Sequence, residues 1–250
     1  MTLALRTGLA ALLTASVAFS AAAFDMNAMS DDERSAFRAE IKSYLLENPE
    51  VLMEAVEVYN QRQEAAQGDN DAALIAAHYD QLYNAPGDLI LGNPDGDIVM
   101  VEFSDYRCGY CKRAHPDMKA LLEGDGNIKL IVKEFPILGE ASTLASRFAI
   151  ATRLVEGDEV YARLHEALME TNGDITLGIL KRIAKGIDIN VGAVTDKMDD
   201  DEVTAQIATN HQLGSVLQIN GTPSFVLEGQ FLRGYVPYDA MKEIVAELRG

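Results

Sequence analysis

The chain has 250 residues, of which 48% are hydrophobic and 24% charged, a composition ordinary for a soluble globular protein. Its length predicts one full domain with an appendage, or two small domains. The 39 acidic and 21 basic residues give a net charge of −18, with no run of five or more basic residues. Because so acidic a surface repels phosphate backbones, nucleic-acid binding is not expected.

The first 23 residues predict a secretory signal peptide. Arg6 is the only charge in this apolar and small-residue stretch. Ala21 and Ala23 take the −3 and −1 positions of a cleavage site before Phe24. The apolar part is shorter than the roughly 20 residues of a membrane-spanning helix, which favours cleavage over retention as an anchor. The mature protein is therefore expected to be exported.

Residues 24–85 predict a small helical N-terminal region. Ser30 and Glu33 have the spacing of a capping box, and helix breaks are expected at residues 48–49 and 68–70. Apolar residues recur at helical intervals: Phe37, Ile41, Tyr44, Leu45, Leu52, Val56, Tyr59, Leu74, Ile75, Tyr79 and Leu82. Since stripes this thin bury little core by themselves, the region is expected to dock on the rest of the chain or on another copy of itself.

Residues 86–250 predict an α/β domain, in which helices cover a sheet. Strands are expected at 89–91, 98–103, 128–135, 224–227 and 231–233, helices at 108–122 and 238–248, and a helical insert at about 142–217 with breaks near Gly157, Gly173 and Gly186. A fragment that begins near Pro86 is expected to be a folded, redox-active monomer.

The chain contains only two cysteines, Cys108 and Cys111. Export places them where disulfides persist, but a bond between them would close too short a loop to stabilise the fold. Cys108 lies where a predicted strand meets a predicted helix, and the helix dipole there favours the thiolate, which is the nucleophile. Cys111 follows one turn later on the same side and can resolve a mixed disulfide. The pair therefore predicts a redox centre.

Metal binding is the alternative use of these two thiols. Half of a zinc site, with His115 as third ligand, is disfavoured because the sequence has no second cysteine pair. A soft ion such as Cu(I) would suit the dithiol, assisted by Met26 and Met29. The favoured prediction is redox chemistry with no cofactor and no resident metal.

Residues 101–116 (VEFSDYRCGYCKRAHP) resemble the active-site segment of bacterial periplasmic DsbA-like proteins, thiol–disulfide oxidoreductases of the thioredoxin fold. In this resemblance Cys108 and Cys111 are the attacking and resolving cysteines, and Pro116 is the proline that kinks the active-site helix. Glu102 is the acidic residue buried beneath the disulfide. The strand pattern also favours burial of Glu102, whose raised pKa would let it exchange a proton with Cys111.

Thr222 and Pro223 resemble the loop whose cis-proline faces the active site in this family. The resemblance implies that the Thr222 backbone pairs with an extended substrate peptide. Gly109 and Tyr110, between the cysteines, are also assigned to substrate binding. Tyr106 is expected to contribute, with Tyr110, to an apolar substrate surface.

The CGYC motif and the threonine before the cis-proline resemble DsbC-type isomerases, whereas the N-terminal region resembles the extension of ScsC-type proteins, several of which oligomerise through it. The resemblance implies a thioredoxin fold with a helical insertion. The function is predicted as a periplasmic protein disulfide isomerase or reductase, with net dithiol oxidation or copper binding as alternatives. Expected partners are exported proteins that contain cysteine, a membrane redox partner that recycles the cysteines, and further copies of the chain bound through residues 24–85.

Overall fold

A computed structural model describes residues 28–250. The predicted signal peptide and Met26 lie outside the described residues. The chain divides into two compact units, which meet between Asn60 and Gln61. Within residues 28–250, no helix has the length and apolar character needed to cross a membrane.

The N-terminal unit consists of α1 (Asp31–Glu47) and the first part of α2 (Glu50–Ala77). The predicted capping box is present, because the Ser30 side chain accepts from the Glu33 backbone N–H while the Glu33 carboxylate accepts from the Ser30 N–H at 2.8 Å. The predicted break at residues 48–49 separates the two helices. None of the residues of α1 is buried.

The predicted break at residues 68–70 is wrong, because α2 continues through it without interruption. A glycine in a helix interior costs only about 1 kcal/mol relative to alanine, which neighbouring contacts can offset. Here Gln67 donates to Asp71 at 2.7 Å, and Arg233 forms a two-pronged ion pair with the same Asp71. These contacts hold the helix on both sides of Gly68.

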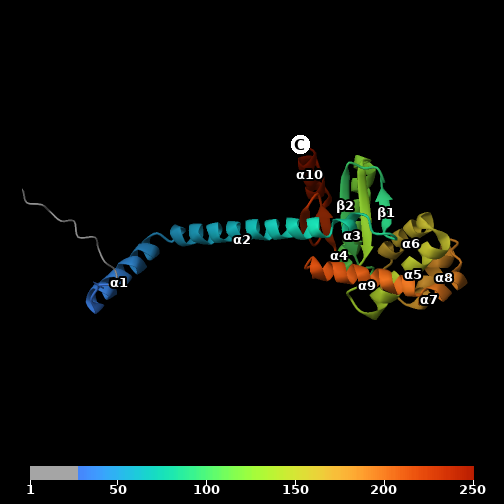
Figure 1. Cartoon of the computed structure of the whole chain (residues 1–250), viewed down its shortest axis with the longest axis horizontal. Helices are drawn as coiled ribbons and strands as arrows, with labels where there is room; N and C mark the ends of the chain where they lie inside the picture. Colours follow the sequence, from blue (N-terminus) through green and yellow to red (C-terminus); the bar gives the residue numbers. More distant parts are fainter. Residues whose placement is uncertain (1–27) are drawn as a thin grey trace, which may run out of the picture. The chain divides into compact units, whose positions relative to one another are not determined.

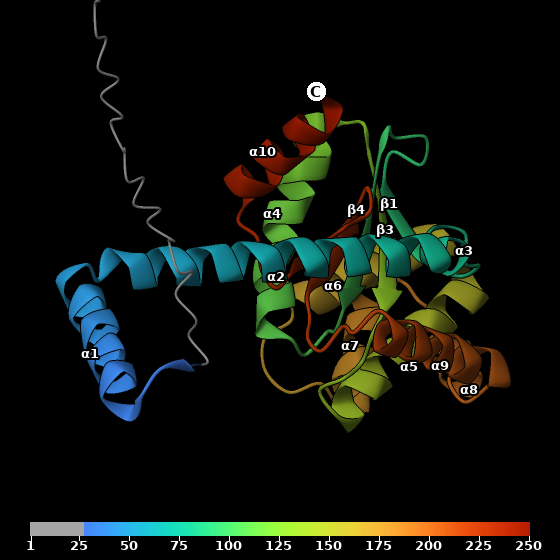
Figure 2. The same cartoon turned by 60° about the vertical axis from the view of Figure 1, so that its left-hand side comes forward.

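The C-terminal unit contains a five-stranded sheet within the described residues. Its strands are β1 (Leu89–Gly92), β2 (Ile98–Ser104), β3 (Ile128–Glu134), β4 (Ser224–Leu227) and β5 (Gln230–Arg233). Their order across the sheet is β1-β3-β2-β4-β5, with β2 and β3 parallel and the other pairs antiparallel. Figure 2 shows the sheet with α4 and α10 beside it.

The remaining helices include the predicted insert between β3 and β4 (Figure 1). They are α3 (Tyr79–Tyr83), α4 (Gly109–Asp125), α5 (Glu140–Glu156), α6 (Asp158–Glu170), α7 (Leu177–Gly186), α8 (Val191–Lys197), α9 (Asp201–Val216) and α10 (Tyr238–Arg249). The predicted breaks fall at or between helix ends, whereas the separation of α8 from α9 was not predicted. The α/β class with a helical insert and a helical N-terminal region is confirmed.

Alternate residues of the strands build two cores, one on each face of the sheet. On the first face, Met100 and Leu130 pack with α4, α6 and α10. On the second face, Val101 and Phe103 pack with α9 and with Ile75 of α2. Both faces of β2 are therefore buried, as is typical of a central strand covered by helices.

The end of α2 and the short helix α3 contribute side chains to the second core. Ile75 is 3% and Leu82 0% exposed among residues of the sheet. The buried Lys133 ammonium also donates to the Gln81 carbonyl at 2.6 Å. The compact unit thus begins well before the boundary expected near residue 86.

Candidate active site

The two cysteines and the Thr222–Pro223 loop meet at one end of the central strand. Cys108 is the N-cap of α4, a few residues after β2 ends. Because β4 is antiparallel to β2, with Phe103 opposite Ser224, the loop before β4 lies beside the turn after β2. The Cys108 thiol donates to the Thr222 carbonyl at 3.0 Å. The sheet register thus joins residues that are 114 positions apart in the sequence.

The sulfurs of Cys108 and Cys111 have different environments, although both are free thiols. Cys108 is 6% exposed, whereas Cys111 is 0% exposed. The Cys111 thiol donates toward the Cys108 sulfur and lowers the pKa of Cys108 to about 5. The Cys111 backbone N–H, 3.3 Å from that sulfur, acts in the same direction. Burial raises the pKa of Cys111 far above that of a free thiol.

Glu102 lies on β2 beneath the cysteines and is 6% exposed, as the strand pattern predicts. Burial raises the pKa of its carboxyl to about 7, and the nearby negative charge of the Cys108 thiolate adds to the effect. A group that titrates near neutral pH can accept and return a proton under ordinary conditions.

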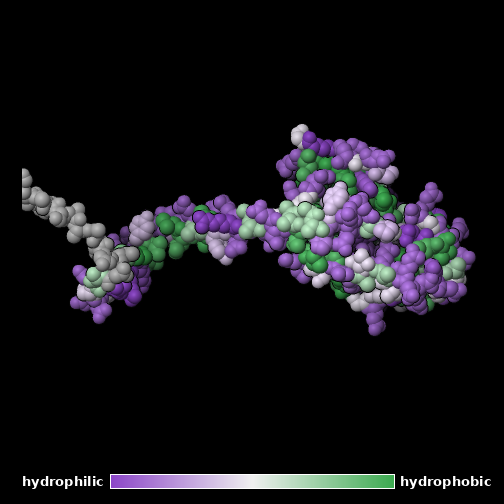
Figure 3. All heavy atoms as spheres, in the orientation of Figure 1, coloured by the Kyte–Doolittle hydropathy of each residue, from purple (hydrophilic) through white to green (hydrophobic). Residues whose placement is uncertain are grey.

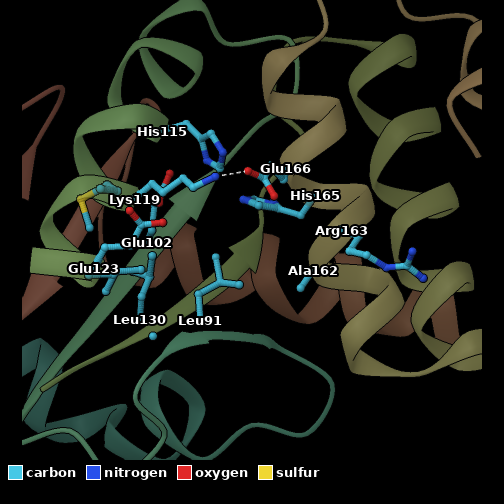
Figure 4. A pocket seen from close by; sticks show the side chains of 13 residues that line it. Leu91, Glu102, His115, Lys119, Glu123, Leu130, Ala162, Arg163, His165 and Glu166 are labelled. Atoms are coloured by element: carbon cyan, nitrogen blue, oxygen red, sulfur yellow. Dashed lines mark hydrogen bonds and ion pairs between the residues drawn. The ribbon is translucent and has the colours of Figure 1, made fainter. Parts of the chain in front are cut away.

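A cavity of about 310 Å³ lies against Glu102, between α4 and α6 (Figure 4). It is lined by Leu91, Gly92, Glu102, His115, Met118, Lys119, Leu122, Glu123, Leu130, Ala162, Arg163, His165 and Glu166. In the close-up His115, His165 and Glu166 point toward one another, and the ion pair of Lys119 with Glu166 joins the two helices. This volume is large enough for ordered water beside the Glu102 carboxyl.

The residues assigned to substrate binding lie around the Cys108 sulfur. Gly109 and Tyr110 are exposed, the latter by 62%, while Thr222 is half-buried. The Thr222–Pro223 peptide bond is cis, as the resemblance implies. The expectation for Tyr106 is wrong: it is 1% exposed, because its ring packs into the core and its hydroxyl binds buried groups. Tyr106 therefore contributes nothing to a substrate surface.

Within residues 28–250 no cluster of three or more His, Cys, Asp or Glu side chains could hold a metal ion. His115 therefore does not complete a zinc site with the cysteines in that range. Its Nε2 atom is buried and lacks a hydrogen-bond partner among the described residues. The lining residues contributed by α6 were not predicted as part of the site, since nothing in the local sequence shows that α6 crosses behind α4.

Known proteins match both parts of the chain. Residues 99–246 match the model of the DSBA-like thioredoxin domain, and residues 33–66 match the copper resistance protein ScsC N-terminal domain. Disulfide bond formation protein D of Bacillus subtilis (strain 168) is 27% identical over 177 residues, which cover 66% of this chain and 78% of that protein.

Solved structures show the same likeness in three dimensions. A thioredoxin-like oxidoreductase from Silicibacter pomeroyi DSS-3 has a TM-score of 0.64 at 39% identity, covering 68% of this chain and 96% of that chain. A linker-deletion mutant of Proteus mirabilis ScsC has a TM-score of 0.67 at 27% identity, covering 88% of this chain and 96% of its own.

Fold and site together define a thiol–disulfide oxidoreductase of the thioredoxin fold. The chain belongs to the family of DSBA-like thioredoxin-domain proteins, whose model matches more than half of its length. The predicted family and fold class are confirmed, and so is the function of thiol–disulfide oxidoreductase. Proteins of this family act on substrates that contain cysteine and are recycled by membrane partners.

Proposed function

We propose that Cys108 is the attacking thiolate and Cys111 the resolving thiol of this oxidoreductase. The observation that carries this assignment is the position of Cys108 at the start of α4, where its sulfur faces the Cys111 N–H at 3.3 Å. A pKa of about 5 keeps Cys108 largely ionised at neutral pH, whereas burial keeps Cys111 protonated.

The exchange then proceeds in two balanced steps. The Cys108 thiolate attacks one sulfur of a substrate disulfide, whose S–S bond breaks as the other sulfur leaves as a thiolate. Cys111 loses its proton, attacks the Cys108 sulfur and releases the substrate as a second thiolate. The substrate gains two electrons, and Cys108 and Cys111 become a disulfide. When a thiol of the substrate performs the second attack instead, the disulfide is isomerised with no net redox change.

Glu102 is proposed as the acceptor of the Cys111 proton. Its charge already acts on Cys111, since it contributes to the raised pKa of that thiol. The cavity against Glu102 supplies water through which the proton can reach solvent. Proton transfer by a positioned carboxyl typically contributes 10²–10⁴-fold to a rate.

The loop of Thr222 and Pro223 is proposed to bind the substrate chain next to the sulfur of Cys108. An extended peptide can add to an exposed backbone edge through main-chain hydrogen bonds. Exposed Tyr110 and backbone of Gly109 would complete the binding surface, because they lie between the cysteines and are open to solvent.

We further propose that the protein acts as an isomerase or reductase in an oligomer of two or three copies. Large apolar side chains are exposed in the N-terminal unit: Phe37, Ile41, Tyr44, Leu46, Leu52, Met53, Val56, Val58 and Tyr59. Figure 3 shows apolar side chains at the surface of α2. A second copy of the chain carries the same apolar stripe, so the stripes of two copies can pack on each other. The several active sites of such an oligomer would hold one misfolded client protein by multivalency.

The physiological setting follows from the proposed export signal. The substrates are proposed to be exported proteins with cysteines, and a membrane redox partner is proposed to return Cys108 and Cys111 to the working state. An isomerase or reductase needs the pair mostly reduced, whereas a net oxidase needs it mostly oxidised. Alkylation of the cysteines in intact cells measures which state predominates.

Trapping of mixed disulfides tests the cysteine roles. Cys111→Ser should accumulate disulfide-linked substrates through Cys108, because the resolving thiol is missing. Cys108→Ser should accumulate none, since the buried Cys111 reacts poorly. Trapping by Cys108→Ser alone would reverse the assignment. Refolding of a scrambled multi-disulfide substrate by the wild-type chain then measures isomerase activity, and its absence would leave reduction or net oxidation as the function.

A further inference from the structure

A second buried carboxylate, Glu134, has no part in the proposed exchange reaction. It ends β3, opposite Ser104 of the parallel strand β2, and is 1% exposed. The Tyr106 and Tyr161 hydroxyls each donate to its Oε1 atom at 2.7 Å, and the Ser146 hydroxyl donates to Oε2 at 2.6 Å. Both oxygens of this buried carboxylate are therefore hydrogen-bonded, by three buried hydroxyl donors in all.

The three donors come from two different parts of the fold. Tyr106 belongs to the turn between β2 and Cys108, whereas Ser146 and Tyr161 belong to α5 and α6 of the helical insert. The backbone carbonyl of Glu134 also accepts from Asn210 of α9 at 3.1 Å. Glu134 thus joins the turn before the nucleophile to three helices of the insert.

The Tyr106 ring already packs in the core, and the bonds of its hydroxyl add a polar restraint to that packing. Tyr106 precedes Cys108 by two residues, and the Cys108 N–H closes the turn onto the Asp105 carbonyl at 3.0 Å. The Tyr106 hydroxyl lies 3.1 Å from Nδ1 of His165, whose ring also faces the cavity (Figure 4). The hydroxyl is therefore fixed between His165 and Glu134.

A second set of contacts anchors the backbone of the same turn. The Asp105 carboxylate accepts from the N–H groups of Ile137 and Leu138 at 2.8 and 3.0 Å. These bonds hold the turn against the segment that follows β3, but they make no contact with the Tyr106 side chain. The Tyr106 hydroxyl to Glu134 bond is thus a separate restraint, which ends two residues from the reactive sulfur.

We propose that Glu134 is a positioning residue for Cys108, which acts through the hydroxyl of Tyr106. The bond fixes the turn so that the Cys108 sulfur meets the Cys111 N–H at the start of α4. Without this restraint, the turn can carry the Cys108 sulfur away from the hydrogen-bond donors that stabilise its thiolate. This inference rests on the proposed role of Cys108 as nucleophile.

Two tyrosines provide a matched pair of variants in the full-length chain. Tyr106→Phe and Tyr161→Phe each remove one buried hydroxyl that donates to the same Glu134 oxygen at the same distance. Both should lower the unfolding midpoint in urea, because a buried acceptor loses a donor. Only Tyr106→Phe should raise the pKa of Cys108, by about one unit, or about tenfold less thiolate below that pKa. Thiolate ultraviolet absorbance against pH measures this pKa.

A purely structural role predicts a different result, namely that both variants lose stability while the Cys108 pKa stays the same. That outcome, or equal pKa shifts in the two variants, would overturn the proposal. Glu134→Leu separates position from charge, because it removes the acceptor of the Tyr106 hydroxyl together with the carboxylate charge. Loss of a negative charge through space would lower the Cys108 pKa, whereas loss of the hydroxyl's acceptor should raise it, and a lowered or unchanged value counts against positioning.

Failure of the inference can be told apart from failure of the proposed function. If Cys108→Ser retains full disulfide exchange, the assignment of the nucleophile is wrong. If Cys108→Ser is inactive but Tyr106→Phe leaves the pKa and the alkylation rate of Cys108 unchanged, the nucleophile stands and only the role of Glu134 is lost.

Discussion

The two compact units differ in whether their apolar helix faces are covered by other parts of the chain. In residues 61–250, strands and helices from distant parts of the chain cover one another, so that Leu82 and Met100 are 0% exposed. In the described part of the N-terminal unit, α1 has no buried residue, and Leu46 is 72% exposed. Amphipathic helix patterns therefore predict that a face needs a partner, but they leave open whether the same chain supplies it.

The largest effect is expected from variants that disrupt the proposed self-association of the N-terminal unit. Ile41→Glu combined with Leu52→Glu should convert the oligomer to a monomer, because a charge in an apolar interface is costly to desolvate. Isomerisation of a multi-disulfide substrate should be lost, while reduction of a small disulfide persists. Light scattering at micromolar concentration measures the mass.

Ala39→Glu is the control for the Ile41→Glu change in α1, since it adds the charge of one glutamate on the side of the helix opposite Ile41. It should leave the oligomer intact. A wild-type chain that is already monomeric would show that the exposed stripe serves another purpose.

The next effect concerns the boundary of the C-terminal unit. A fragment that starts at Pro86 lacks Ile75 and Leu82, which fill the second core, and should lose roughly 4 kcal/mol or more of stability. A fragment that starts at Gln61 keeps both side chains and should unfold at a higher urea concentration. Equal midpoints would mean that residues 61–85 contribute no core.

Glu102→Gln should stabilise the protein in a pH-dependent manner. The pKa of the buried carboxyl is about 7 against an ordinary 4.5, so the unfolded chain ionises first. Wild-type stability consequently falls as pH rises from 4.5 to 7 and is constant above that. The variant should match wild type near pH 4 and exceed it at pH 8 by on the order of 3 kcal/mol.

The same variant should also resolve mixed disulfides more slowly, since the proposed proton acceptor is gone. Glu123→Gln, at an exposed position beside the same cavity, is the matched control and should change neither property. Equal stability curves for Glu102→Gln and wild type would show that Glu102 is solvated.

The smallest effect tests the continuity of α2. Gly68 lies within the helix, and a methyl group added there would meet no atom within 4 Å. Gly68→Ala should therefore stabilise the protein by about 0.5–1 kcal/mol, because it restricts the unfolded chain. A loss of stability would indicate that the helix needs the freedom of glycine at this point.

The sequence was most informative where chemistry and local pattern coincide. Cys108, Cys111 and Glu102 were predicted from a strand, a helix start and their spacing, and the Thr222–Pro223 loop from a family motif. The structure brings all of them together at one end of the sheet.

Long-range packing accounts for what sequence reasoning missed. Glu134 follows Lys133 in what reads as the charged end of a strand, yet both are buried by partners far along the chain. Tyr106 was assigned to the surface, because a tyrosine near a reactive cysteine commonly binds substrate. The burial of Glu134 and Tyr106 could not be predicted without knowing that α6 lies against the end of β3.

The place of β2 in the sheet has a consequence for local unfolding. β2 is hydrogen-bonded on both sides, by β3 and β4, whereas the four-residue strands β1 and β5 form the edges. Amide hydrogens at the edges should exchange with solvent first, and those of Val101 and Glu102 near the rate of global unfolding. Fluctuations that open the edge strands would thus leave β2 closed beneath the cysteines. Cys111 would then stay buried and react only with the Cys108 sulfur of a mixed disulfide.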